Sequence, residues 1–143
     1  MTTTQIVTVE LEDKPGTLGT VTRTLAKGGV NITGFAVCGG YGIFLTDNPK
    51  KGAQVLESEG FDTNVQSGFE VSPPNMPGQL ANLTENLGNE GINITGAFGV
   101  TNFGGKGGSN EGRLYVVVND VKKATPVFER LAGSQTATAP RGN

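Results

Sequence analysis

The spacing of apolar residues changes along the chain in a regular order. Residues 5–11 alternate between apolar and polar, which is typical of a half-buried strand. Leu18, Val21 and Leu25 are then spaced by three and four residues, which predicts a helix that ends at the next glycine pair, Gly28-Gly29. The chain therefore opens with a strand followed by a helix.

The following residues predict a hairpin and a second helix. Strands are expected at about 30–37 and 41–46, joined by Cys38-Gly39-Gly40, because glycines favour a tight turn. Asn48-Pro49 predicts the start of a helix, with a side-chain cap and a proline in its first position. Residues 61–71 contain the last strand of this set and the first strand of the next, so the linker between them is expected to be short.

The chain contains one motif twice. Residues 14–34 return as residues 76–96, at an offset of 62 residues (77 minus 15), and ten of the 21 aligned positions are identical. The identical positions mix apolar, turn and polar residues, which indicates a duplication rather than a biased composition.

The second copy repeats the order of elements. Strands are expected at 92–101 and 112–118, with a glycine-rich insertion at 103–112 between them. A helix is expected at 120–131, in which Pro126 should either kink the helix or move its start to Thr125.

Each copy therefore follows the order β-α-β-β-α-β, which predicts the α+β class. We expect two ferredoxin-like βαββαβ units packed side by side, each with a four-stranded antiparallel sheet and two helices on one face. Units of this size are marginally stable alone, so the two copies are expected to pack together. The predicted domains are residues 1–66 and 67–132, followed by a flexible tail at 133–143.

Composition narrows the possible partners. The net charge is −2 over 143 residues, with no run of like charges, so neither nucleic acid nor a membrane is an expected partner. One cysteine and no histidine argue against a transition-metal site and an internal disulfide. No cofactor is expected. No segment has the ~20 apolar residues of a membrane span, and the first residues do not resemble a signal peptide, so a cytoplasmic location is expected.

The repeated motif resembles a known family. A strand, Pro-Gly-x-Leu, an amphipathic helix and Gly-Val/Ile-Asn-Ile, in this order, are similar to the ACT domain, an amino-acid-sensing module of amino-acid metabolism. The resemblance covers about residues 5–70 and 67–132 and implies a stand-alone tandem ACT protein, a non-catalytic regulator that binds an amino acid. Similar proteins include regulatory subunits of acetolactate synthase and the tandem-ACT repressor of glycine cleavage.

The Pro-Gly motif also has a physical interpretation. A proline fixes φ at the start of a helix, and Gly16 and Gly78 leave the first-turn backbone open to a ligand. Unpaired N–H groups at a positive helix end, such as those of Thr17 and Leu18, suit a carboxylate. The alternative is that Pro-Gly only shapes the turn. Leu18 and its equivalent Leu80 are expected to be core residues that also form the floor of the pocket.

An asparagine precedes the second strand of each copy. Ile32 and Ile94 are expected to face the helices, so Asn31 and Asn93 point elsewhere. The alternative role for these side chains is a hydrogen bond to nearby backbone at the turn.

The resemblance implies that an asparagine at this place, with another just before Pro-Gly, holds serine in serine-sensing ACT domains. In the second copy, Asn75 matches the asparagine just before Pro-Gly. In the first copy, Asp13 takes this place, which departs from the family pattern.

The Pro-Gly turn and the asparagine lie at opposite ends of one helix, about 20 Å apart for ~13 residues. A single amino acid cannot span this distance, so a shared ligand requires the turn of one copy and the asparagine of the other. Two unequal sites are predicted: Asn75, Gly78 and Leu80 with Asn31 and Ile32; and Asp13, Gly16 and Leu18 with Asn93 and Ile94. We favour the first, because Asp13 would repel a carboxylate.

Other functions were weighed against amino-acid binding. An RNA-binding module shares this fold, but residues 112–117 contain one aromatic, Tyr115. An enzyme with a phosphate-binding loop at 104–108 lacks the required spacing, and no pair of carboxylates suggests acid–base catalysis. A ligand-free scaffold that recruits a metabolic enzyme stays open. Exposed strand edges also favour a homodimer. Cys38 is expected to be a small hydrophobic residue without a chemical role.

Overall fold

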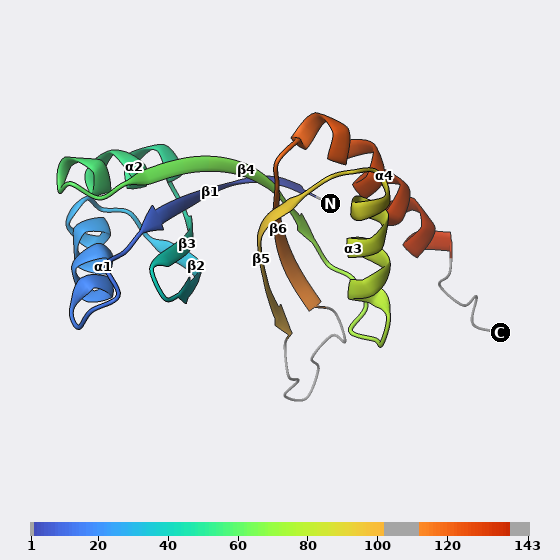
Figure 1. Cartoon of the computed structure of the whole chain (residues 1–143), viewed down its shortest axis with the longest axis horizontal. Coiled ribbons are helices and arrows are strands. Elements are labelled where there is room, and N and C mark those ends of the chain that lie inside the picture. Colours follow the sequence, from blue (N-terminus) through green and yellow to red (C-terminus); the bar gives the residue numbers. More distant parts are fainter. Residues whose placement is uncertain (1, 102–111, 138–143) are drawn as a thin grey trace. The chain divides into compact units, whose positions relative to one another are not determined.

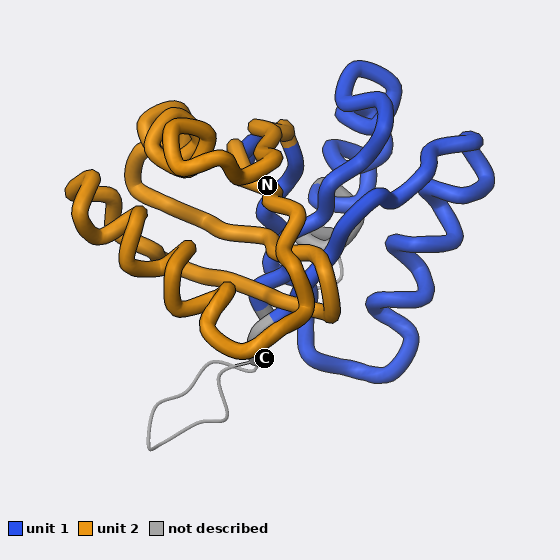
Figure 2. Tube along the Cα trace, turned by 60° about the vertical axis from the view of Figure 1, so that its left-hand side comes forward, with its two compact units in different colours: residues 1–4, 68–143 blue, residues 5–67 orange. Residues whose placement is uncertain are grey.

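The computed structural model describes residues 2–101 and 112–137, which form helices and an antiparallel sheet (Figure 1). The elements in chain order are β1 (Thr2–Glu10), α1 (Thr17–Lys27), β2 (Ile32–Cys38), β3 (Tyr41–Thr46), α2 (Pro49–Ser58), β4 (Thr63–Val71), α3 (Gln79–Asn89), β5 (Ile94–Thr101), β6 (Gly112–Val118) and α4 (Val121–Ala137). The chain divides into two compact units, an N-terminal unit of residues 5–67 and a C-terminal unit of residues 1–4 and 68–143 (Figure 2). The predicted α+β class with two ferredoxin-like units is confirmed.

The N-terminal unit follows the predicted order of elements. Helix α1 buries Val21 and Leu25 and ends before the glycine pair, as expected. Helix α2 begins at Pro49, where Oδ1 of Asn48 accepts a hydrogen bond from the Lys51 amide at 3.1 Å. The core between the helices and the sheet consists of buried residues Val7, Val9, Leu11, Val21, Leu25, Val30, Phe44, Ala53 and Leu56.

The C-terminal unit has an equivalent core. Helix α3 buries Leu83 and Leu87, and the rings of Phe69 and Phe128 stack with their centroids 4.1 Å apart. The other buried members are Ile92, Leu114, Val116, Val118, Ala124 and Val127. Each unit therefore has a hydrophobic core of its own between helices and sheet.

Helix α4 begins close to the predicted residue 120 and ends later than the sequence predicts. A start at Thr125 is wrong, because Oδ1 of Asp120 caps the helix by accepting from the Lys123 amide at 3.0 Å. Pro126 lies inside the helix, and the Thr125 hydroxyl donates to the Val121 carbonyl at 2.8 Å. The helix continues to Ala137, into the predicted tail, and residues 138–143 lie outside the described residues.

The expected short linker between the two copies is absent from the described chain. Strand β4 runs without interruption through the boundary at residue 67, so its first half belongs to the N-terminal unit and its second half to the C-terminal unit. The strand order is β2-β3-β1-β4-β6-β5. Glu10 donates through its amide to the Asp62 carbonyl at 2.9 Å, which pairs the end of β1 with the start of β4.

The first residues of β1 complete the sheet of the C-terminal unit. Residues 2–4 belong to that unit, and β1 neighbours β4 in the strand order. In a ferredoxin-like unit this position beside the first strand is filled by a strand that follows the second helix. No strand follows α4 as far as Ala137, so the N-terminus of the chain takes this place among the described residues.

The hairpin of the N-terminal unit has the predicted turn. Strands β2 and β3 are joined at Gly39-Gly40, as predicted, and both β2 and β5 show a register shift after their first residue. Residues 103–111 of the predicted glycine-rich insertion lie outside the described residues. Among the helices that the structure describes, none combines the length and the apolar character needed to cross a membrane.

Candidate functional site

Both Pro-Gly turns have the same backbone geometry. Gly16 precedes α1 with φ 91°, and Gly78 precedes α3 with φ 88°. These values lie in the left-handed region that side chains disfavour, so the glycines are required by the turn itself. Neither helix has a side-chain cap at this end. The first turn of each helix is therefore bare backbone.

The first-turn amides are only partly used. Thr17 donates its amide to the Lys14 carbonyl at 3.4 Å, so of the two amides expected to be free, only that of Leu18 stays unpaired within the described chain. The Gly19 amide is unpaired there as well. In α3 the amide of Gln79 is likewise bonded, whereas those of Leu80 and Ala81 have no partner in the described residues. Two adjacent donors at a positive helix end suit a carboxylate.

The leucines beside these amides are not core residues. Leu18 is 37% exposed and Leu80 is 56% exposed, and neither belongs to the hydrophobic core of its unit. The prediction that they are core residues is therefore wrong, because the buried face of each helix starts one turn later, at Val21 and Leu83. Each leucine instead presents apolar surface next to the unpaired amides.

The residues before the two turns differ in charge. Asp13 and Asn75, which precede Lys14-Pro15 and Met76-Pro77, are both exposed. The ammonium of Lys14 forms an ion pair with Glu12 and lowers the pKa of that carboxyl group through a hydrogen bond. The N-terminal turn is thus surrounded by charges.

The strand-opening asparagines are held by their backbone alone. The amides of Asn31 and Asn93 donate to Oδ1 of Asp47 and Oδ1 of Asn119, each at 3.0 Å. The carboxamides of Asn31 and Asn93 have no hydrogen-bond partner among the residues described, which argues against the alternative in which they bind nearby backbone.

Sequence reasoning missed Asp47 and Asn119. Each lies just before the cap of the following helix, and its side chain accepts a hydrogen bond from the asparagine that precedes an earlier strand, 16 residues away for Asp47 and 26 for Asn119. The only sequence clue was that an Asx residue occupies the same place in both copies. Ile32 and Ile94, by contrast, pack against the cores as predicted.

Neither unit brings its own turn and asparagine together. Gly16 precedes α1 and Asn31 follows it, and the 11 residues of this helix span about 16 Å. Gly78 and Asn93 are separated in the same way by α3. The pairing of residues from different copies stays a prediction.

A cavity of about 530 Å³ adjoins the first turn of α1. Its lining includes Thr17, whose hydroxyl oxygen is buried without a hydrogen-bond partner in the structure as described. Glu10, Glu12, Glu59 and Asp62 also line the cavity, and Lys14 is its basic residue. This acidic surface suits an ammonium group better than a carboxylate. In the described residues, no group of three side chains is arranged to hold a metal ion.

Several known protein structures are similar to this chain. The chain is similar to the crystal structure of protein BT0572 from Bacteroides thetaiotaomicron, with 25% identity and a TM-score of 0.72 over 90% of this chain and 88% of that chain. The regulatory subunit of aspartate kinase from Thermus flavus has 16% identity and a TM-score of 0.61 over 90% and 92% of the two chains.

The regulatory subunit of aspartate kinase from Thermus thermophilus, in its ligand-free form, is 18% identical, with a TM-score of 0.59 over 94% and 92% of the two chains. At these identities the aspartate kinase subunits show a shared fold. A comparison with curated protein sequences gave no significant match. The family model described as "ACT domain pair" matches residues 1–124, so the chain belongs to the ACT domain pair family.

Proposed function

We propose that this protein is a non-catalytic regulator that binds a free amino acid at the start of α1 or α3. The observation that carries the proposal is the pair of unpaired amides behind a left-handed glycine, which occurs in both units. An α-carboxylate would accept both hydrogen bonds at the positive end of the helix. The exposed Leu80 beside the α3 amides offers apolar surface for the rest of the ligand.

The turn before α3 is the better candidate for the carboxylate. Its neighbours Asn75 and Met76 are neutral, whereas Asp13 and the Glu12–Lys14 ion pair precede α1. A negative charge close to the N-terminal turn would weaken binding of a carboxylate.

The proposed primary site combines Asn75, Gly78 and Leu80 with Asn31 and Ile32, and the secondary site combines Asp13, Gly16 and Leu18 with Asn93 and Ile94. A carboxamide both donates and accepts, so an asparagine can bind the ammonium or the carboxylate of the ligand. The free carboxamide of Asn31 supports its place in this proposal.

The family supports a regulatory role rather than catalysis. Two of the similar structures are regulatory subunits of aspartate kinase. We therefore propose that the protein acts on an enzyme of amino-acid metabolism. The homodimer and the cytoplasmic location expected from the sequence stay predictions.

A binding screen tests the proposal. Each standard amino acid is added in a thermal-shift experiment, and a ligand at 100 times its dissociation constant should stabilise the fold by about 2.7 kcal/mol. Calorimetry then compares Gly78→Ala, which places a methyl group at φ 88°, with Gly88→Ala in the same helix, where an added Cβ meets nothing within 4 Å. Loss of binding in the first variant alone supports the site.

The opposite results identify the alternative. If no amino acid shifts the melting temperature, the protein is better explained as a ligand-free scaffold. If an amino acid binds but both variants retain its affinity, the ligand occupies another place, and the proposed turn is wrong.

A further inference from the structure

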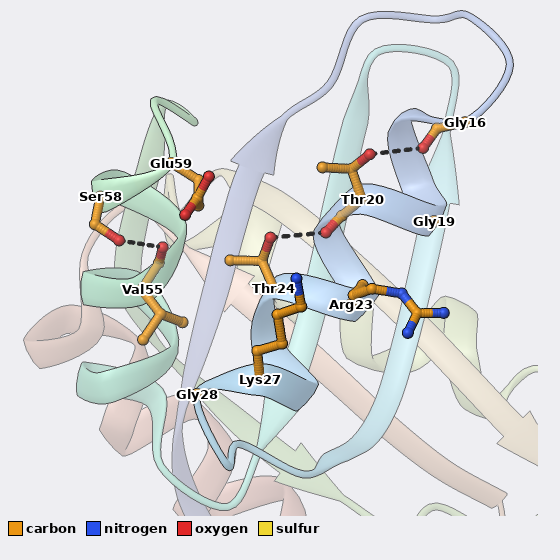
Figure 3. A pocket seen from close by; sticks show the side chains of 10 residues that line it. All are labelled: Gly16, Gly19, Thr20, Arg23, Thr24, Lys27, Gly28, Val55, Ser58 and Glu59. Atoms are coloured by element: carbon orange, nitrogen blue, oxygen red, sulfur yellow. Dashed lines mark hydrogen bonds between the residues drawn. The ribbon is translucent and has the colours of Figure 1, made fainter.

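A groove on the helix-bearing side of the N-terminal unit contains basic residues that the proposed function does not use, although Gly16 of the secondary site also lines it. It has a volume of about 620 Å³ and runs between α1 and α2 (Figure 3). Arg23 and Lys27 line it from α1, and Val55 and Ser58 line it from α2. All of these residues belong to the same unit, so the groove does not depend on the C-terminal unit.

The side-chain hydrogen-bond donors that the groove offers to a ligand are cationic. The hydroxyls of Thr20, Thr24 and Ser58 donate to carbonyls of their own helices, at 3.1, 2.8 and 2.7 Å. Arg23 and Lys27 have no ion-pair partner among the described residues. Arg23 and Lys27 are exposed, so their donors are open to a ligand, and a carboxylate forms charge-assisted hydrogen bonds with such cations.

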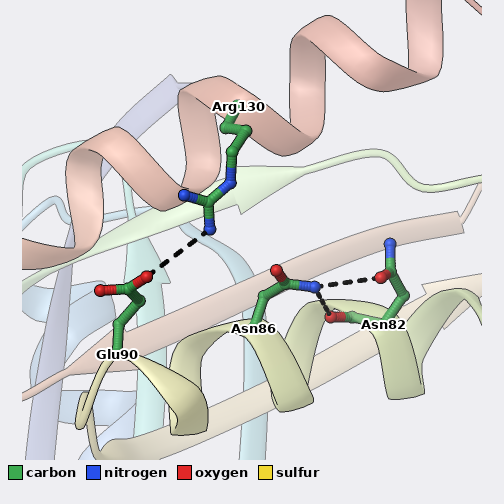
Figure 4. A network of polar contacts seen from close by, with 4 residues as sticks. All are labelled: Asn82, Asn86, Glu90 and Arg130. Atoms are coloured by element: carbon green, nitrogen blue, oxygen red, sulfur yellow. Dashed lines mark hydrogen bonds and ion pairs between the residues drawn. The ribbon is translucent and has the colours of Figure 1, made fainter.

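The C-terminal unit has different residues at the basic positions of the groove. The duplication aligns Arg23 with Glu85 and Lys27 with Asn89. It also aligns Gly28 with Glu90, whose carboxylate forms an ion pair with Arg130 of α4 at 4.0 Å (Figure 4). Counted from the helix caps, Arg130 corresponds to Ser58.

The ion pair between Glu90 and Arg130 thus joins α3 to α4 in the C-terminal unit. In the N-terminal unit the matching pair is Gly28 and Ser58, which cannot form such a bridge. A Cβ at Gly28 would lie 2.8 Å from Cγ1 of Val55, so the helices also approach too closely there for a larger residue. The basic groove is therefore a property of one copy and not of the fold.

Gly19 adds an independent observation. It lies in α1 and lines the groove, and an added Cβ would meet nothing within 4 Å. Glycine lowers helix stability relative to alanine, and the equivalent residue in α3 is Ala81. The isolated unit gives no steric reason for glycine here. Close approach of another chain to the helix backbone supplies one.

We propose that the groove between α1 and α2 binds an acidic segment of a partner protein, with two carboxylates placed one helical turn apart against Arg23 and Lys27. These two residues are four apart on α1, so their side chains share one face of the helix. Glu59, the C-cap residue of α2, also lines the groove and repels carboxylates, which favours their binding beside Arg23 and Lys27. The inference does not depend on amino-acid binding.

A labelled peptide tests this surface. The probe is a fluorescein-labelled, alanine-rich peptide with glutamates four residues apart, and its control carries glutamines in their place. Anisotropy should show binding of the glutamate peptide that weakens at higher salt. The double variant Arg23→Glu/Lys27→Glu should lose at least tenfold in affinity, and amide shifts in NMR spectra should fall on residues that line the groove.

Steric variants distinguish a docked segment from a small anion. Gly19→Leu should block the peptide, whereas the matched Ala81→Leu in α3 should leave its affinity unchanged, with circular dichroism confirming that both variants are folded. Equal effects of the two leucines would overturn the proposal. So would citrate competing for Arg23 and Lys27 with an affinity that Gly19→Leu does not alter, because this outcome identifies a small-anion site.

Two further results also contradict the proposal. The first is a peptide affinity that the charge reversal leaves unchanged. The second is self-association of the wild-type protein, without peptide, that Arg23→Glu/Lys27→Glu abolishes, because a second copy of the chain would then occupy the groove.

Discussion

Asn31 and Asp47 bind each other through two hydrogen bonds. The Asn31 amide donates to Oδ1 of Asp47 at 3.0 Å, and the Asp47 amide donates to the Asn31 carbonyl at 3.1 Å. Asn93 and Asn119 repeat this arrangement at 3.0 Å for both bonds. The pair fixes the backbone of each strand-opening asparagine and leaves its carboxamide free.

Asp47→Ala should lower the free energy of unfolding by about 0.5–1.5 kcal/mol, because the Asn31 amide loses its acceptor. Asp47→Asn is the matched control, since the second copy already uses an asparagine in this place. Urea denaturation measures both changes. Equal stability of wild type and Asp47→Ala would show that the side-chain bond contributes nothing.

Substitution by alanine should change the stability of the protein in opposite directions at two glycines that lie only three residues apart. Gly16→Ala should destabilise the protein by about 1–2 kcal/mol, because φ is 91° there. Gly19→Ala should stabilise it by about 0.5–1 kcal/mol, because the site has room for a methyl group and the helix gains a better former. Thermal denaturation of both variants gives the comparison, and a change of the same sign in both would contradict this interpretation.

Gly68 allows two strands to approach each other closely. An added Cβ would lie 2.5 Å from the carbonyl oxygen of Val116, which is backbone on the neighbouring strand β6. Gly68→Ala should therefore cost about 1–3 kcal/mol, as overpacking does elsewhere. Chemical denaturation should show this loss, while Gly88→Ala, which has open space, should show none.

Asn31→Ala and Asn75→Ala test whether residues of different copies share one ligand. Each should weaken amino-acid binding about tenfold, since each removes one hydrogen-bonding group worth ~1.4 kcal/mol. In the double variant the losses should not add, because residues that contact one ligand are coupled. Asn93→Ala, in the secondary site, is the control. If only one of the two asparagines affects binding, the proposed pairing is wrong.

Removal of residues 2–4 should weaken the C-terminal unit. These residues belong to that unit, and β1 is the neighbour of β4. Their loss exposes a strand edge, so amides of α3, α4 and β6 should exchange faster with solvent while those of α1 and α2 change less. Hydrogen exchange followed by NMR resolves the two groups. If all amides exchange at the same rates in the shortened chain as in the full chain, residues 2–4 do not stabilise the C-terminal unit.

Most element boundaries could be predicted from local chemistry. Pro15-Gly16 and Asn48-Pro49 start α1 and α2 as expected, because proline and an Asx cap act on their immediate neighbours. Pro126 does not mark the start of α4, because the capping bond of Asp120 starts this helix before the proline.

Features that depend on tertiary structure could not be predicted in this way. Whether Leu18 is buried or exposed depends on where α1 meets the sheet. Periodicity alone does not distinguish the first helical turn from later ones. The assignment of residues 2–4 to the C-terminal unit requires knowledge of pairing between strands far apart in the sequence. The Asn31–Asp47 bond links residues 16 apart for the same reason.

The unbroken course of β4 restricts how the repeat can be rebuilt. Side chains alternate between the two faces of a strand, so inserting one residue at the junction of Ser67 and Gly68 would turn every later side chain of the strand, Phe69 included, toward the opposite face. Insertions in pairs would preserve the alternation. Chimeras made by exchanging halves with related proteins must therefore be joined in phase within this strand, since the chain provides no spacer to absorb an odd residue.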